Sequence, residues 1–121
     1  MAINKILTVD DSKVDLINIQ NIISNAGYQV ITASSGAEAI EKAAAEVPDL
    51  IFMDVVMEHM DGYQACRELT HNSATKNIPI IFVTSKGQKA DRVWAEMTGG
   101  KGLVQKPYTA EQIVEQINLI K

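Results

Sequence analysis

Four apolar runs in the sequence end at side chains that could bind a metal ion or a phosphate group. The run ILTV is followed by Asp10 and Asp11, and the run LIFM is followed by Asp54. The run IIFV ends at Thr84, and the run LVQ ends at Lys106. A carboxylate placed directly after a buried run costs free energy unless a partner compensates it. These five residues are therefore the candidates for a functional site.

The elements that must position these residues follow from apolar runs that alternate five times with amphipathic stretches. We predict strands at Lys5–Val9, Gln29–Ala33, Leu50–Asp54, Ile80–Thr84 and Leu103–Gln105. We predict helices at Ser12–Ala26, from Ser35 to the residues before Pro48, from Asp61 to about Thr70, near Lys89–Thr98, and from Thr109 onward. Ser35 with Glu38 has the pattern of an N-terminal capping box.

The strand pattern indicates the fold class. The runs LIFM and IIFV are apolar on both faces, as strands covered by helices on both sides must be. This predicts an α/β protein with a doubly wound, five-stranded parallel sheet of order 2-1-3-4-5, the flavodoxin-like arrangement. Ligands then bind beyond the carboxyl ends of the first and third strands. Asp10, Asp11 and Asp54 should converge in that crevice, with Thr84 and Lys106 facing the same pocket.

Three converging carboxylates need protons or a compensating cation. Two carboxylates about 5 Å apart repel by roughly 3 kcal/mol at an effective dielectric of about 20. Oxygen ligands without histidine or thiolate favour Mg²⁺ or a similar ion such as Mn²⁺, and the shell of such an ion is usually completed by phosphate oxygens. Thr84 and Lys106 would donate to the same oxygens. A simpler interpretation stays open for single residues, since an aspartate after a strand is often only a helix N-cap.

The composition is that of a soluble globular protein. The 121 residues are 46% hydrophobic and 21% charged, and we expect a single domain over residues 1–121. The net charge of −4 gives no electrostatic reason to expect nucleic acid or an anionic membrane as a partner. The single cysteine, Cys66, excludes an internal disulfide, and no apolar run approaches the length of a membrane span. We therefore expect a cytoplasmic location.

The motifs ILTVDDS, MDVVM…DG, IIFVTS and QKPY resemble those of response-regulator receiver domains of the CheY-like type, over essentially the whole chain. The resemblance implies that Asp54 is a nucleophile that accepts a phosphoryl group from the phosphohistidine of a histidine kinase. It also implies that magnesium is held by Asp11, Asp54 and the backbone carbonyl of Val56, with Asp10 supporting through water. Such a domain catalyses its own phosphoryl transfer and dephosphorylation and is not a conventional enzyme.

The same resemblance assigns the contacts to the acyl phosphate to Thr84 and Lys106, with Lys106 positioned by a cis peptide bond to Pro107. Only one helix remains after this pair, so we expect no effector domain. The output would be a protein target bound through the face of the fourth helix, the last strand and the last helix. The alternative output is that of a phosphate sink, which drains a shared kinase.

A finer resemblance is to the small stand-alone receivers of type IV pilus chemosensory systems, the PilH-like group that governs twitching motility. The most particular part of it is the pattern formed by Gln88, Asp91, Val93 and Trp94. This resemblance implies a histidine kinase of a chemosensory type as the phosphodonor, in twitching motility or chemotaxis-like signalling.

The sequence departs from the family pattern at several positions. Glu58 follows Met57 where the family usually has proline, and Leu103 stands where the family commonly has a tyrosine or phenylalanine as a rotameric switch. Val56 and Lys86 occupy positions where the family tunes hydrolysis of the phosphoryl group. The resemblance therefore does not carry over the rigidity of the loop, the form of the switch or the phosphoryl lifetime.

Two other functions share parts of this pattern. Many magnesium-dependent phosphohydrolases with an aspartyl-phosphate need an acid two residues after the nucleophile, where this chain has Val56. A flavodoxin-like FMN carrier needs a hydroxyl- and glycine-rich loop after the first strand, where Asp10 and Asp11 would repel the phosphate. Core packing is the expected role of Cys66, while Trp94 could pack under its helix or contact a partner.

Overall fold

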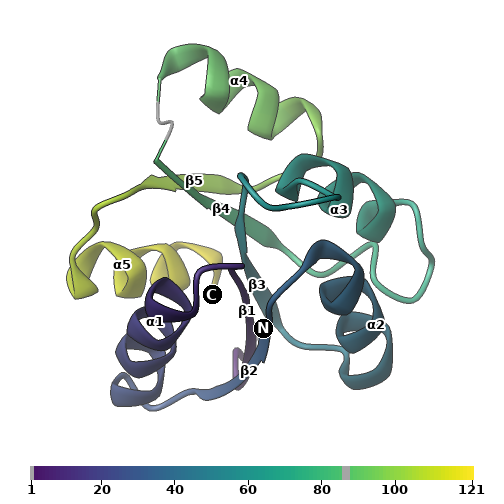
Figure 1. Ribbon diagram of the computed structural model, residues 1–121. Helices are drawn as coiled ribbons and strands as arrows, with labels where there is room; N and C mark the ends of the chain where they lie inside the picture. The colour runs from purple at the N-terminus through teal and green to yellow at the C-terminus, as the bar shows by residue number, and fades with distance from the viewer. Residues whose placement is uncertain (1, 86–87) are drawn as a thin grey trace.

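The computed structural model describes residues 2–85 and 88–121, in which strands and helices alternate (Figure 1). The strands are β1 (Lys5–Val9), β2 (Gln29–Ala33), β3 (Leu50–Asp54), β4 (Ile80–Thr84) and β5 (Gly102–Gln105). The helices are α1 (Lys13–Asn25), α2 (Gly36–Glu46), α3 (Gly62–Thr70), α4 (Lys89–Met97) and α5 (Ala110–Ile120). Each predicted strand and helix is present, with differences only at element ends. Lys86 lies outside the described residues.

The five strands form one parallel sheet in the order β2-β1-β3-β4-β5, which confirms the predicted fold class. Every residue of β3 and β4 is buried, as the two-sided apolar runs predict. The chain winds from β1 to one edge of the sheet at β2, and from β3 onward it winds to the other edge. The carboxyl ends of β1 and β3 therefore lie side by side where the winding reverses.

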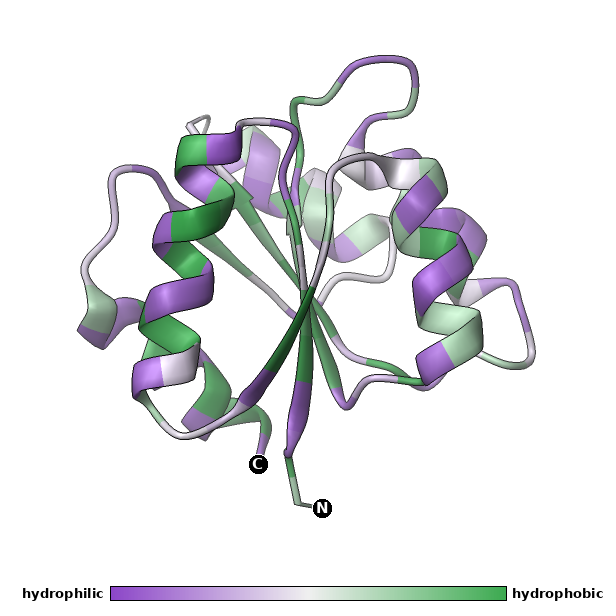
Figure 2. Cartoon of the chain, turned by 60° about the horizontal axis from the view of Figure 1, so that its bottom comes forward, coloured by the Kyte–Doolittle hydropathy of each residue, from purple (hydrophilic) through white to green (hydrophobic). Residues whose placement is uncertain are grey.

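Helices cover both faces of the sheet (Figure 1). α1 and α5 lie on one face, where they bury isoleucine side chains against the strands: Ile19, Ile23, Ile113 and Ile117. α2, α3 and α4 lie on the other face, where α2 and α3 contribute mainly small side chains: Ala39, Ala43, Ala65 and Cys66. Figure 2 shows apolar residues concentrated on the strands, whereas apolar and polar residues alternate along the helices. The expected core position of Cys66 is confirmed.

Side chains cap the helices at positions that the sequence indicates. Three of these caps accept a hydrogen bond from the backbone N–H three residues later: Ser12, Asp61 and Thr109. Ser35 caps α2 in the same way, accepting from Glu38 N at 3.1 Å. The predicted capping box is wrong in its second half, because the Glu38 carboxylate reaches one residue further back. It accepts from the backbone N (2.8 Å) and the hydroxyl (3.0 Å) of Ser34.

Trp94 on α4 is partly packed and partly open to solvent. Its ring meets Tyr63 of α3 edge-on, with centroids 6.2 Å apart, and Tyr63 meets Phe82 of β4 edge-on at 5.0 Å. Trp94 is nevertheless 45% exposed, and Val93 and Met97 on the same helix are exposed as well. Packing under the helix therefore accounts for only part of the Trp94 surface. None of the helices in the described ranges is long and apolar enough to cross a membrane.

Thr8 in β1 provides a test of how strictly this core excludes unpaired polar groups. Within residues 2–85 and 88–121, its hydroxyl is the one buried side-chain polar atom without a hydrogen-bond partner. Thr8→Val keeps the shape of the side chain and removes that hydroxyl, so we expect the free energy of unfolding to rise by about 1 kcal/mol. Urea unfolding measures this change. The control is Thr32→Val at the paired, half-buried position of β2, where we expect a change within about 0.5 kcal/mol. A destabilised Thr8→Val variant would contradict the prediction.

Candidate functional site

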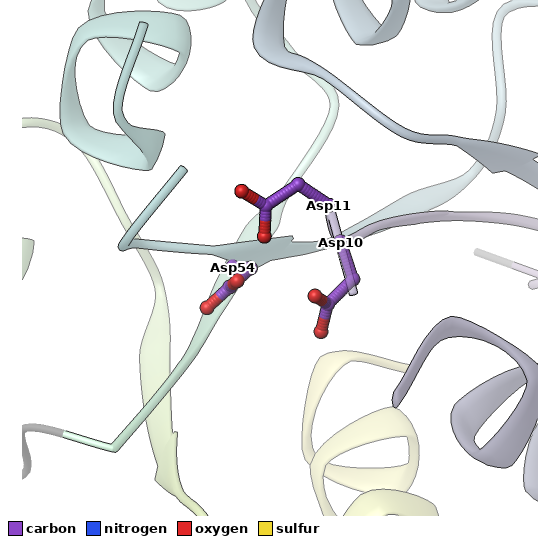
Figure 3. Close-up of side chains that lie close together, drawn as sticks. All are labelled: Asp10, Asp11 and Asp54. Atoms are coloured by element: carbon purple, nitrogen blue, oxygen red, sulfur yellow. The ribbon is translucent and has the colours of Figure 1, made fainter. Parts of the chain in front are cut away.

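Three carboxylates gather at the carboxyl ends of β1 and β3 (Figure 3): Asp10, Asp11 and Asp54. One oxygen atom of each lies within 4.8 Å of the others. Asp10 and Asp54 are buried, whereas Asp11 is exposed. The cluster thus converges as the sheet order predicts, with two buried carboxylates and one at the rim. An oxygen-only donor set of this kind fits a hard cation such as Mg²⁺ or Mn²⁺.

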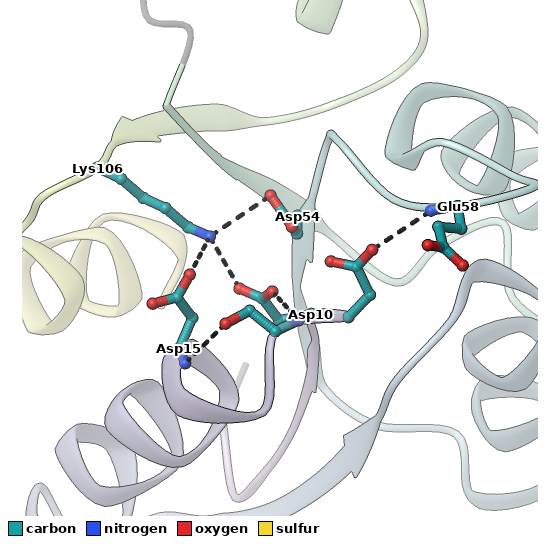
Figure 4. A network of polar contacts seen from close by, with 7 residues as sticks. Asp10, Asp15, Asp54, Glu58 and Lys106 are labelled. Atoms are coloured by element: carbon teal, nitrogen blue, oxygen red, sulfur yellow. Dashed lines mark hydrogen bonds and ion pairs between the residues drawn. The ribbon is translucent and has the colours of Figure 1, made fainter.

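Backbone N–H groups orient two of these carboxylates. Asp10 Oδ1 accepts from Ser12 N at 2.9 Å, at the start of α1. Asp11 Oδ2 accepts from Glu58 N at 3.3 Å, which joins the end of β1 to the loop after β3 (Figure 4). A proline at position 58, as the family usually has, could not donate this bond because it lacks an N–H group. The departure at Glu58 therefore adds a contact to the site.

The ammonium group of Lys106, just after β5, lies among three carboxylates (Figure 4). Its Nζ atom lies 2.9 Å from Asp10 Oδ2, 3.0 Å from Asp15 Oδ2 and 3.7 Å from Asp54 Oδ1. The first two contacts are hydrogen bonds, while the third is an ion pair beyond hydrogen-bonding distance. Lys106 therefore supplies part of the positive charge that the carboxylate cluster needs.

Asp15 is the member of this network that sequence reasoning missed. It lies in the first turn of α1, where its backbone N donates to Ser12 Oγ at 3.4 Å. Side chains on a helix tilt toward its N-terminus, which directs Asp15 toward the strand ends. The sequence feature that could have indicated its place in the network is its position four residues, about one helical turn, after Asp11. That signal is weak, because an acidic residue in a first turn also simply favours the helix dipole.

The electrostatics of the site follow from burial and from these contacts. Burial and the adjacent Asp10 carboxylate raise the pKa of Asp54 from 3.8 to about 7, and the attraction of Lys106 offsets only part of this rise. Burial alone would lower the pKa of Lys106, but hydrogen bonds to Asp10 and Asp15 outweigh it and raise that pKa above its ordinary value. A cation bound among the carboxylates would favour the charged form of Asp54.

The remaining candidate residues lie at the same edge of the sheet. Thr84 ends β4 and is buried, and its carbonyl oxygen accepts from Lys106 N at 2.7 Å. Val56 lies in the loop after β3, where the residue is 54% exposed. The peptide bond between Lys106 and Pro107 is cis, as the resemblance implies.

Gly62, the first residue of α3, closes the loop after β3 against the backbone of the site. Its N–H group donates to the carbonyl oxygen of Val55 at 2.8 Å. A Cβ atom at Gly62 would lie 2.2 Å from the carbonyl oxygen of Asp54. Only glycine allows α3 to begin this close to the end of β3.

Leu103, in place of the family's aromatic switch residue, is buried in β5 and pairs with Phe82 of β4. Its carbonyl oxygen accepts from Arg92 Nη1 at 3.5 Å. A groove of about 250 Å³ between α4 and β5 is lined by Leu103 together with Arg92, Val93 and Gly100, among others. The Leu103 side chain, which is smaller than a tyrosine or phenylalanine, thus lies beside this groove.

The protein thus has a flavodoxin-like sheet, an acidic crevice where the winding of that sheet reverses, and a lysine ammonium group beside the crevice. Residues 6–118 match the response regulator receiver domain family, and the chain belongs to this family. It is 36% identical over 116 residues to protein PilH of Pseudomonas aeruginosa, covering 96% of each chain. It is 34% identical to protein PilG of the same organism, covering 93% of this chain and 84% of PilG.

Solved structures show the same architecture. Chemotaxis protein CheY4 of Vibrio cholerae superposes with a TM-score of 0.93 at 29% identity, covering 99% of this chain and all of the other. The receiver domain of a sensor histidine kinase of Pseudomonas aeruginosa PAO1 superposes with a TM-score of 0.89 at 27% identity, covering 98% of this chain and 97% of the other. That structure has a magnesium ion coordinated in its active-site cleft.

Proposed function

We propose that this protein is a response regulator in which Asp54 of the receiver domain accepts a phosphoryl group from the phosphohistidine of a histidine kinase. The observation that carries the proposal is the arrangement around Asp54. A buried carboxylate at the end of β3 lies within 4.8 Å of two further aspartates and 3.7 Å from a lysine ammonium. Neither packing nor helix capping accounts for this combination.

The reaction forms a bond between an oxygen of Asp54 and phosphorus, and breaks the bond between phosphorus and the histidine nitrogen. The electron pair of that bond leaves with the imidazole. A magnesium ion held by Asp11, Asp54 and the Val56 carbonyl, with Asp10 supporting through water, would neutralise charge on the phosphoryl oxygens. Lys106 and the Thr84 hydroxyl would donate to the same oxygens.

The hydrolase alternative finds less support at the site. An acid two residues after the nucleophile would be needed to protonate the leaving group, and Val56 offers an exposed apolar side chain there. In the response regulator that we propose, hydrolysis of the Asp54 phosphoryl group ends the signal.

The proposed pathway is chemosensory signalling in the cytoplasm, in twitching motility or a chemotaxis-like system. The relatives PilH and PilG and the similarity to a chemotaxis protein support this assignment. The phosphodonor is then a chemosensory histidine kinase. The output is either a protein target bound through the face of α4, β5 and α5, or drainage of phosphoryl groups from a shared kinase.

The test is incubation with acetyl phosphate and Mg²⁺, followed by intact-mass measurement. We expect the wild type to gain one phosphoryl group and Asp54→Asn to gain none. We expect Mn²⁺ to replace Mg²⁺, and a chelator to prevent the gain. Equal uptake by Asp54→Asn, or uptake that a chelator leaves unchanged, would refute the proposal.

A further inference from the structure

Lys106 has more carboxylate partners than its proposed role requires. A lysine that stabilises a phosphoryl group on Asp54 needs to reach that group. Its Nζ atom instead makes hydrogen bonds to Asp10 (2.9 Å) and Asp15 (3.0 Å), and lies 3.7 Å from Asp54 Oδ1. In Figure 4, Asp15 and Asp54 approach the ammonium from different sides.

Asp15 differs from the other two partners in its surroundings. The Asp10 and Asp54 side chains are only 6% and 7% exposed, whereas the Asp15 side chain is 44% exposed. Asp15 also lines a hollow of about 310 Å³ with Lys106, and Asn18, Ser85, Pro107 and Tyr108 form the rest of its lining. The Asp15 side chain can therefore turn into water and open space when it releases Lys106. The buried Asp10 side chain has no such space around it.

We infer that Asp15 is a positioning residue that holds Lys106 away from Asp54 until a phosphoryl group arrives. The inference rests on the proposed function. The three phosphoryl oxygens offer Lys106 a more highly charged partner than Asp15, so the ammonium moves to them and Asp15 turns toward solvent. Asp15 thereby stabilises the unphosphorylated state and slows phosphorylation.

Loss of the phosphoryl group should not depend on Asp15 in the same way. Once Asp54 is phosphorylated, Lys106 has left Asp15 in both the ground state and the transition state of hydrolysis. A residue that merely supported the fold would alter both rates or neither. A residue that aligned Lys106 for the reaction would lower the phosphorylation rate when removed. Only a competing partner raises phosphorylation while leaving hydrolysis unchanged.

The experiment compares the wild type with Asp15→Asn at saturating Mg²⁺, using acetyl phosphate and intact-mass time courses. A partly exposed ion pair contributes little, so we expect the phosphorylation rate constant to rise roughly two- to fivefold. The rate constant of phosphoryl loss, measured after the donor is removed, should stay within about 1.5-fold. High salt should reduce the gain, because it screens exposed charges.

Two controls separate this effect from a general change in charge. Glu111→Gln removes one exposed negative charge from the first turn of α5, as Asp15→Asn does from the first turn of α1, and should leave the rate within about 1.5-fold. Asp15→Asn combined with Lys106→Met should phosphorylate no faster than Lys106→Met alone. A fall in the rate, a gain matched by Glu111→Gln, or a gain that persists without Lys106 overturns the inference. Absence of phosphoryl uptake in the wild type overturns the proposed function, and this inference with it.

Discussion

Replacing Asp54 with asparagine is expected to stabilise the metal-free protein at pH 8 by on the order of 2–4 kcal/mol. The pKa of Asp54 is raised from 3.8 to about 7, first by burial and then by Asp10. A raised acid pKa means that the folded state retains a proton that the unfolded state releases. The wild type therefore loses stability as the pH rises from about 4 to about 7, by up to about 4 kcal/mol. Asparagine has no such titration.

Urea unfolding in the absence of divalent ions measures this effect at pH 4.5 and pH 8. We expect a large advantage of Asp54→Asn at pH 8 and a difference below about 1 kcal/mol at pH 4.5. Adding Mg²⁺ at pH 8 should reduce the advantage, because a cation that binds the folded wild type stabilises it. An advantage of equal size at both pH values would contradict the electrostatic explanation.

Asp49 is a control for which we expect stability to depend on pH in the opposite direction. Its Oδ2 atom accepts from the backbone N of Lys5 and of Asn4, and these hydrogen bonds lower its pKa below 3.8. A lowered acid pKa contributes stability that is present above the ordinary pKa and is lost as the pH falls. Asp49→Asn should therefore destabilise the protein at pH 8 and have less effect at acidic pH.

Gly62→Ala is expected to destabilise the protein by about 2–3 kcal/mol or more. The added Cβ would lie 2.2 Å from the carbonyl oxygen of Asp54 and 2.9 Å from the Cα of Val55. Both are backbone atoms, so relief requires α3 or the end of β3 to move. Because Asp54 lies at that end, we also expect weaker Mg²⁺ binding, measurable by titration calorimetry.

Gly36→Ala is the matched control, since Gly36 is likewise the first residue of its helix, α2. The three atoms nearest to its added Cβ would all belong to the flexible side chain of Met60, at 3.0–3.2 Å. Alanine also reduces the conformational entropy of the unfolded chain, which favours folding by about 0.4–1 kcal/mol. We therefore expect Gly36→Ala to change stability by less than about 1 kcal/mol. Similar losses in the two variants would show that the approach to Asp54 is not the cause.

The fold and the convergence of the site could be predicted because both depend on strand ends. Each strand is marked by its own apolar run, and parallel strands place all their carboxyl ends at one edge. Asp54 and Lys106 could thus be assigned to one crevice although they are far apart in sequence. The order of strands still had to come from the regularities of such sheets, since no local pattern encodes it.

Contacts that depend on side-chain direction could not be predicted in the same way. The three carboxylates cannot be told apart by their positions at strand ends, but Asp11 lies at the exposed rim while Asp10 is buried against Lys106. Asp15 was overlooked because one acidic residue in a first turn has an ordinary explanation. The Glu38 carboxylate accepts from the backbone N of Ser34 and not of Ser35. Spacing rules do not distinguish between two donors that are one residue apart. These outcomes depend on the tertiary placement of single atoms.

The hydrogen bond between Lys106 and Asp10 joins residues 96 positions apart, and this separation has a consequence during synthesis. Ribosomes add about 5–20 residues per second, so Lys106 is made several seconds after the strands that carry the aspartates. Until then, the nascent chain has the acidic residues without their lysine, and their mutual repulsion opposes closure of the crevice. A chain interrupted before β5 therefore lacks the ammonium group that partly balances the charge of these carboxylates. Under the proposed function, incomplete translation products would therefore not divert phosphoryl groups from the kinase.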